Sequence, residues 1–291
     1  MQRRQCYDSG MRPSATPKGG RRSLRIVTAV VVIAMALVAR SAYAAEPPVL
    51  VKARALYNAA DYDGAIAAAA QARTQPGSAD AAALVEARAH LERYRQTADA
   101  ADLGAARDAL STVHSSALMP RDQLDFLVGL GQSLYFGELF GPAAELFDTA
   151  IERGAFLPTR DRMMLLDWWA TALDREAQAS DPDRRTRLYE RMAARMGEEL
   201  RRDPGSAPAN YWRAVAARGV GDIDAAWDAA VAAWVRAPLD SETSVWLRSD
   251  IDHLVTQAII PERARIRPAR DQGDATEALR SQWESVKQQW K

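Results

Sequence analysis

A short sequence unit recurs along this chain, and it constrains the fold more than any other feature. Each copy has a Gly or Asp near the end of one helix-forming segment, then a short turn, then an alanine-rich segment. The copies occupy residues 61–66, 138–143 and 221–226. Repeats of this kind predict stacked helical hairpins, because one hairpin alone cannot bury its apolar face.

Apolar residues at helical spacing and breaker motifs divide the following chain into helix pairs. The expected helices cover residues 49–60, 62–74, 79–95, about 102–113, 121–136, 141–153, 161–175, 186–202, 208–218 and 223–235. A polar segment, 176–185, separates the two helices of the fourth pair. Strand signals are few, and abundant alanine favours helices and their close packing, so the sequence predicts an all-α fold.

Small and large residues follow one another in these hairpins in a pattern that resembles the tetratricopeptide repeat family. The clearest match is formed by Leu127, Leu130, Gly131, Leu134, Phe140, Ala143, Phe147 and Ala150. Units around Ala65 and Ala226 are similar. The resemblance implies an α-solenoid of stacked antiparallel helical hairpins, in which small residues let two backbones approach and large ones fill the remaining space.

The spacing of the units departs from the family period of about 34 residues. Ala65 and Ala106 are 41 residues apart, Ala106 and Ala143 are 37 apart, and Ala143 and Ala226 are 83 apart. Met192 stands where a small residue is expected, and the second and fourth units match the family poorly. We therefore expect four or five hairpins over residues 45–238, with longer helices or loops between them.

Residues 239–291 follow a different pattern. A helix over about 241–259 is expected to cap the last hairpin by covering its apolar face. Four arginines in the segment 261–270 indicate a solvated linker or, alternatively, a docking site for an acidic partner. A final amphipathic helix, about 274–290, carries Trp283 and shows no obvious core of its own.

The first 44 residues have the order of an export signal. Basic residues precede an apolar run at 26–39, and Ala42-Tyr43-Ala44 supplies the small residues that a signal peptidase requires. We expect cleavage after Ala44 and a periplasmic or secreted protein that meets the membrane only during export. An uncleaved anchor is the alternative, but about 14 apolar residues fall short of the roughly 20 that a spanning helix needs. Either Met1 or Met11 is the start.

Removal of the leader makes the protein acidic. Eight of the 38 Lys and Arg residues and one of the 38 Asp and Glu residues lie within 1–44, which leaves 30 basic and 37 acidic residues. Net acidity disfavours nucleic-acid binding, which needs a basic face. Cys6, the only cysteine, is removed with the leader, so the mature chain is expected to contain no disulfide.

No residue pattern typical of catalysis or of a cofactor site stands out. His90, His114 and His253 lie far apart in the sequence, and none has a partner at metal-ligand spacing. The acidic segment 181–183 lacks the ligand series of a calcium loop, and no glycine-rich phosphate loop follows a strand. We therefore expect a protein without enzymatic activity, cofactor or metal.

The family resemblance implies a groove on the concave face, formed by the first helix of each pair, that binds a polypeptide. The groove residues that it implies are Arg54, Tyr57, Asn58, Gln132, Tyr135, Asp167, Thr171, Asp174, Tyr211 and Arg218. The residues with which some family members clamp a C-terminal carboxylate are missing, because Leu50 and Arg54 occupy those positions. The expected function is a protein interaction scaffold of the cell envelope. A structural subunit of an envelope assembly that uses the C-terminal helix is the alternative, and an enzyme with an unfamiliar site is a third.

Overall fold

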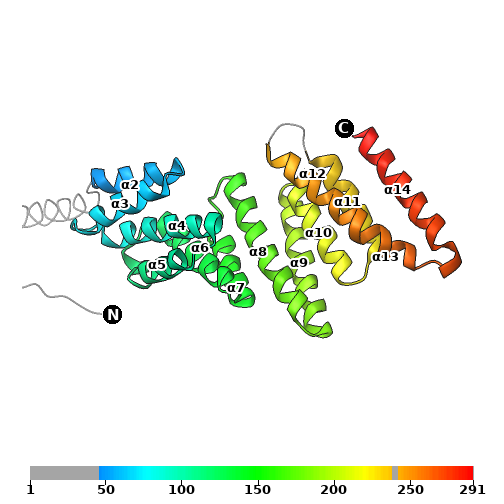
Figure 1. Ribbon diagram of the computed structural model, residues 1–291, viewed down its shortest axis with the longest axis horizontal. Coiled ribbons are helices and arrows are strands. Elements are labelled where there is room, and N and C mark those ends of the chain that lie inside the picture. The colour runs from blue at the N-terminus through cyan, green and yellow to red at the C-terminus, as the bar shows by residue number, and fades with distance from the viewer. Residues whose placement is uncertain (1–45, 238–241, 291) are drawn as a thin grey trace, which may run out of the picture. The chain divides into compact units, whose positions relative to one another are not determined.

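A computed structural model of the protein describes residues 46–237 and 242–290 (Figure 1). Residues Pro48–Lys291 form one compact unit, and its described residues form helices and connecting turns without a strand. The all-α fold class is thereby confirmed. The predicted leader, its cleavage site after Ala44 and the junction at Pro238 lie outside the described residues.

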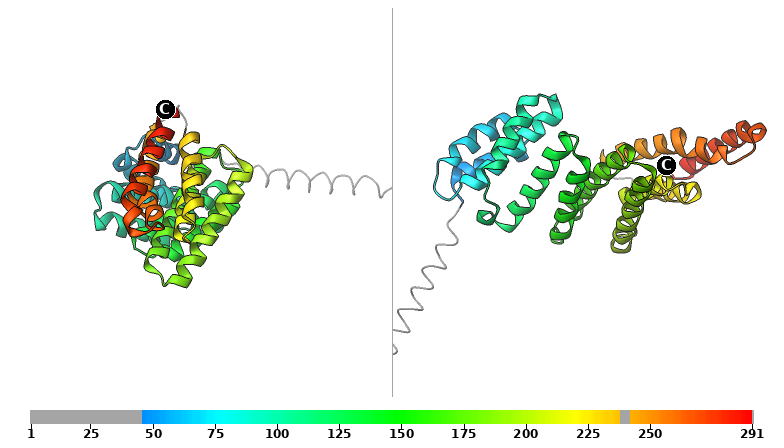
Figure 2. Two further views of the ribbon diagram at one scale, coloured as in Figure 1. Left: turned by 90° about the vertical axis from the view of Figure 1, so that its right-hand side faces the viewer. Right: turned by 90° about the horizontal axis from the view of Figure 1, so that it is seen from below.

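The helices follow one another in pairs (Figures 1 and 2). The first helices of the pairs are α2 (Pro48–Asn58), α4 (Ala79–Thr97), α6 (Pro120–Phe136), α8 (Thr159–Ala179) and α10 (Ala207–Gly219). The second helices are α3 (Tyr62–Arg73), α5 (Ala100–Ser111), α7 (Phe140–Arg153), α9 (Pro182–Arg202) and α11 (Ile223–Arg236). Each helix from α2 to α11 packs against the next, and α2 also contacts α4, α4 contacts α6, and α8 contacts α10. This packing of adjacent pairs is consistent with an α-helical repeat.

The turn inside the hairpin has the same backbone form in four of the pairs. One residue in each of these turns has a left-handed conformation, with φ between 55° and 83°, namely Ala60, Ala98, Glu138 and Gly221. After three of these residues an aspartate caps the second helix. The carboxylates of Asp61 and Asp222 accept hydrogen bonds at 3.0 Å from backbone N–H groups three residues later, and that of Asp99 accepts one at 2.9 Å from the N–H of Ala101. The recurring sequence unit thus encodes a recurring turn and helix start.

Small residues occupy the contacts between helices. Ala65, Ala106, Ala143 and Ala226 are all wholly buried. A Cβ atom placed on Gly131 would lie 2.6 Å from the Phe147 ring, so α6 and α7 can approach this closely only because Gly131 has no side chain. Met192 is also wholly buried, so the fourth pair fills the equivalent contact with a large, adaptable side chain.

The polar segment predicted between the two helices of the fourth pair is mostly helical, so that prediction is wrong. Helix α8 continues to Ala179 and α9 begins at Pro182, which leaves a turn of only two residues. The Glu176 carboxylate accepts a hydrogen bond from the Gly141 N–H at the start of α7, at 3.0 Å, and one from Arg184 of α9, at 2.6 Å. The polar residues therefore join neighbouring helices instead of forming a loop.

The predicted break at Pro261 is also wrong. After residue 241 the described elements are α12 (Glu242–Leu254), the π-helical turn η2 (Val255–Ile259), α13 (Ile260–Arg265), the 3-10 turn η3 (Ala269–Asp271) and α14 (Gln272–Gln289). A proline inside an α-helix removes one N–H group and clashes with the preceding turn, and the wider π-helical turn just before Pro261 accommodates both effects. Much of the expected linker is therefore helical.

The last helix packs on the fifth pair through Trp283, although the sequence showed no obvious core for it. Trp283 of α14 is wholly buried, with its ring centroid 6.0 Å from that of Trp227 and 5.4 Å from that of Trp234. Its Nε1 donates to Asp252 Oδ1 of α12 at 2.8 Å, and Lys287 Nζ donates to the same oxygen at 2.9 Å. Helix α14 thus completes the apolar core of the C-terminal part.

Candidate binding groove

The first helices of four successive pairs line one cavity of about 610 Å³, which we call the groove. Its lining residues are Tyr57 and Asn58 of α2; Arg88, Glu92 and Arg95 of α4; Arg121, Leu124, Asp125, Val128 and Gln132 of α6; Leu157 before α8; and Asp161, Met164, Leu165, Asp167 and Trp168 of α8. The volume lies in the range of small-molecule binding sites.

Ion pairs between different helices fix one wall of the groove. Arg88 of α4 donates to Asp125 Oδ2 of α6 at 2.7 Å and lies 4.5 Å above the ring of Tyr57 on α2. Arg121 of α6 donates to Asp161 of α8 at 3.0 Å. Burial raises the pKa of Asp125 above its ordinary value, and the charges of Arg88 and Arg121 offset part of that increase. These contacts hold the side chains in place before any ligand binds.

The α8 end of the groove combines apolar side chains with an acid. The side chain of Met164 is 61% exposed, and Trp168 is half-buried one turn further along the helix. Between them, Asp167 Oδ1 accepts a hydrogen bond from Nε1 of Trp212 on α10 at 2.9 Å. The surrounding protein desolvates the Asp167 carboxyl and raises its pKa, the Trp212 hydrogen bond lowers the pKa, and the charge of Asp250 raises it further.

Four of the ten residues that the sequence placed in a groove line this cavity, namely Tyr57, Asn58, Gln132 and Asp167. Two others lie beside it. Arg54 donates to both carboxylate oxygens of Asp122 on α6, at 3.0 and 2.7 Å, and so ties α2 to α6. The Tyr135 ring makes an edge contact with Trp168, with centroids 5.3 Å apart, and supports the groove from its side.

The remaining four predicted residues lie outside the lining of the groove. Thr171 and Tyr211 are half-buried on α8 and α10. Asp174 accepts a hydrogen bond from the Tyr189 hydroxyl of α9 at 2.8 Å. Arg218 donates to both carboxylate oxygens of Glu262 on α13, at 2.7 and 3.0 Å, and lines a separate cavity of about 440 Å³.

The structure also brings to the groove residues that the sequence interpretation missed. Arg88, Glu92 and Arg95 of α4 all line the cavity, and Arg95 Nε donates to Glu92 at 2.8 Å. These residues form a charged stripe next to the buried stripe of α4, which contains Leu84, Ala87 and Leu91. Their spacing of four and three residues was the available signal, because it places them on one helix face.

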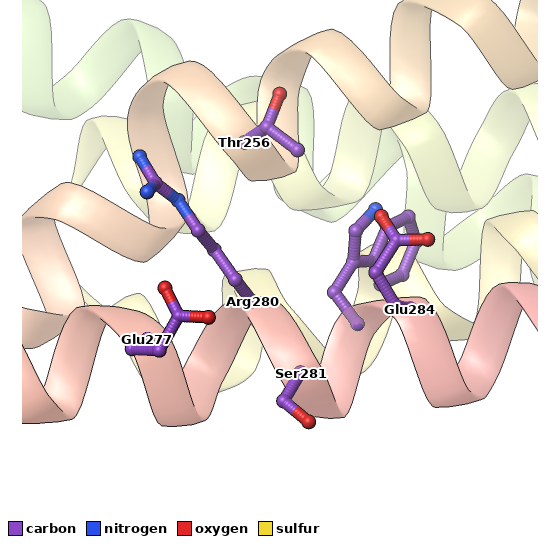
Figure 3. A pocket seen from close by; sticks show the side chains of 6 residues that line it. Thr256, Glu277, Arg280, Ser281 and Glu284 are labelled. Atoms are coloured by element: carbon purple, nitrogen blue, oxygen red, sulfur yellow. The ribbon is translucent and has the colours of Figure 1, made fainter.

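Another cavity, of about 430 Å³, lies between η2 and α14 (Figure 3). Its lining residues are Thr256, Glu277, Arg280, Ser281, Trp283 and Glu284. Figure 3 shows the Arg280 side chain extending from α14 towards the helix that carries Thr256. Because this cavity adjoins the buried Trp283 and contains none of the predicted site residues, we ascribe it to the packing of α14.

Within residues 46–237 and 242–290, no three His, Cys, Asp or Glu side chains gather closely enough to hold a metal ion. None of the described helices combines the length and apolarity needed to cross a bilayer. Comparison of the chain with protein-family models, curated proteins and solved structures gave no match. A functional conclusion therefore depends on the groove itself.

Proposed function

We propose that the protein is a non-enzymatic interaction scaffold that binds a segment of another polypeptide in the groove. The observation that carries this proposal is the lining of a single cavity by helices α2, α4, α6 and α8. Stacked hairpins that bind peptides present side chains from successive first helices to one ligand. The mixture of apolar, amide and charged side chains in the groove suits a polypeptide, which offers all three kinds of contact.

The wider fold proposed for this function is a tetratricopeptide-like solenoid, closed by the helices after residue 241. Two observations support it: the sequence pattern centred on Gly131 and Ala143, and the left-handed turn residue shared by four of the pairs. The first helices of such a solenoid face its concave side. The groove would then be part of that side.

The proposed place of action is the periplasm or the exterior of the cell. The support is the basic, apolar and small-residue order of residues 1–44, with cleavage after Ala44. The acidic balance of the remaining chain and the paired arginines of the groove speak against a nucleic-acid partner. Binding of a polypeptide in the groove requires no cofactor.

Site-specific photo-crosslinking in the native cells tests the proposal. The full-length sequence is expressed with a photoreactive amino acid at Asn58 or Gln132, and the control carries it at Asp108, an exposed position on α5. We expect the groove positions, but not the control, to crosslink to a defined polypeptide. Equal adducts from Asp108 would refute the groove as the site.

A pair of methionine variants sharpens this test. Met164 lies in the groove and is 61% exposed, whereas Met119 is 65% exposed and lies outside the groove lining. Because both side chains are exposed, Glu at either position should leave the core packing intact. Met164→Glu should abolish the crosslink formed from position 132, whereas Met119→Glu should leave that crosslink intact. A crosslink that survives Met164→Glu contradicts the proposal.

A second candidate function, an assembly subunit that contacts its partner through the C-terminal helices, is favoured by two exposed tryptophans. Trp246 of α12 is 74% exposed and Trp290, just after α14, is 47% exposed. Deletion of α14 would remove the buried Trp283 and damage the core, so Trp246→Ser with Trp290→Ser is the better variant. Loss of partner crosslinks in this variant, with groove crosslinks absent, would favour the assembly function.

A further inference from the structure

We propose that the polypeptide segment held in the groove carries a Lys or Arg close to an apolar side chain, with the cation at Asp167 and the apolar group on Met164 and Trp168. This inference rests on the proposed binding function of the groove and specifies the chemistry of its ligand.

The charged side chains of the groove do not balance. Each of its three arginines contacts a groove carboxylate: Arg88 with Asp125, Arg95 with Glu92, and Arg121 with Asp161, at 2.7, 2.8 and 3.0 Å. Asp167 is the one remaining groove acid, and none of the ion pairs among the described residues includes it. Its hydrogen-bond donor, Trp212, carries no charge. The unbalanced charge of the groove is therefore negative and lies on α8.

Asp250 adds a second negative charge near Asp167. Asp250 of α12 raises the pKa of Asp167, and burial together with Asp250, Asp167 and Asp174 raises the pKa of Tyr211 to about 12. Basic groups also act on this region: His253 lowers the pKa of Asp250, and Arg175 and Arg218 lower that of Asp174. Among the residues that the structure describes, no basic group acts in this way on Asp167, so a cation from a ligand would offset the negative charges of Asp167 and Asp250.

An apolar surface adjoins this charge on α8. Met164 and Asp167 are three residues apart on α8, so they lie on one helix face with Cβ atoms about 5–6 Å apart. In an extended peptide, side chains on the same side are two residues apart, or about 6.5 Å. The geometry therefore suits the patterns apolar-x-basic and basic-x-apolar, where x is any residue. Met164 is flexible and can adjust to several apolar side chains.

A random 12-residue display library provides the test, with the full-length protein as bait. We expect the parent protein to enrich peptides that contain a Lys or Arg two residues from an apolar residue. With Asp167→Lys as bait, the basic residue should be replaced by Asp or Glu at the same spacing. Asp228→Lys is the matched control: Asp228 on α11 is exposed and has no ion pair among the described residues, so this variant should select the same peptides as the parent.

A conservative variant guards against a folding defect. Asp167→Asn keeps an oxygen that can accept from Trp212 but removes the charge, so its thermal midpoint should match that of the parent. A synthetic peptide from the parent selection should bind this variant roughly tenfold more weakly, as expected for the loss of one charge-assisted hydrogen bond. Fluorescence anisotropy measures this change.

The outcomes separate this inference from the function on which it rests. Peptides that require Met164 but show no basic preference, or that bind Asp167→Asn as well as the parent, would overturn the inference and leave the groove function standing. Peptides that bind Met164→Glu as well as the parent would overturn both, and so would a library without any enriched sequence.

Discussion

The close contact between Gly131 and Phe147 predicts that replacing Gly131 by alanine lowers the stability of the protein, although the same change usually stabilises a helix. In an α-helix this change normally stabilises by about 1 kcal/mol, since glycine loses more backbone entropy on folding. At Gly131, however, the new methyl carbon would lie 2.6 Å from Cε1 and 2.9 Å from Cδ1 of Phe147. Phe147 is wholly buried, so its ring cannot move aside without disturbing its neighbours.

The size of the effect follows from these two opposing contributions. Overpacking of a core costs about 1–3 kcal/mol, which exceeds the helix gain, so Gly131→Ala should destabilise the protein by roughly 1 kcal/mol. Gly104 of α5 is the matched control, because nothing lies within 4 Å of a Cβ built there. Gly104→Ala should therefore stabilise by about 1 kcal/mol.

Thermal unfolding followed by circular dichroism distinguishes the two variants. For a chain of this length, 1 kcal/mol corresponds to about 2–4 °C, so the midpoint should fall by that amount for Gly131→Ala and rise by it for Gly104→Ala. Phe147→Leu should also cost less in the Gly131→Ala background than in the parent, as a double-mutant cycle would show. A rise for both alanine variants would refute the described packing of α6 on α7.

Three further predictions concern packing, charge and processing. Ala143→Phe should overpack the wholly buried contact of the third pair and lower the free energy of unfolding by about 1–3 kcal/mol or more. An unchanged thermal midpoint would contradict the helix register. Glu199 is 1% exposed, so Glu199→Gln should cost about 3–5 kcal/mol in urea unfolding at pH 7, because it leaves Arg162 without its buried partner. Burial raises the pKa of Glu199, but the hydrogen bonds and charge of Arg162 outweigh burial and lower the pKa overall. The stabilisation should therefore be complete at a pH above the ordinary pKa of glutamate and should decline as the pH falls through and below that value. Glu199→Gln should lack this pH dependence. N-terminal sequencing of the protein from its own cells should start at Ala45, and a chain that retains residues 26–39 would disprove cleavage.

The sequence was informative wherever local chemistry decides the structure. The helix pairs, the turn before Asp61 and Asp222, and the small residues at the helix contacts all follow from turn, capping and packing preferences that act over a few residues. Prediction failed at 176–185 and at Pro261, where polarity and a proline suggested a break. There, contacts with distant residues such as Gly141, and a local π-helical turn, keep the chain helical.

The site was predicted less completely than the fold. The resemblance supplied positions on α2, α6, α8 and α10 but none on α4, although the charged stripe of α4 lines the groove. The partners of Arg54 and Arg218 were equally hidden, because Asp122 and Glu262 lie 68 and 44 residues away in the sequence. Such pairings depend on how hairpins stack, which no local pattern specifies.

The Arg54 to Asp122 contact has a consequence for how the protein opens. In an array where each helix pair contacts only its immediate neighbours, the terminal pair unfolds first and independently of the others. Here a bidentate bridge passes over the second pair and joins the first to the third. Amide hydrogens of α2 should therefore exchange together with those of α6 instead of ahead of them, so that the N-terminal end behaves as one cooperative block. A partner that contacts both α2 and α6 would therefore bind a surface whose two helices are either both folded or both unfolded.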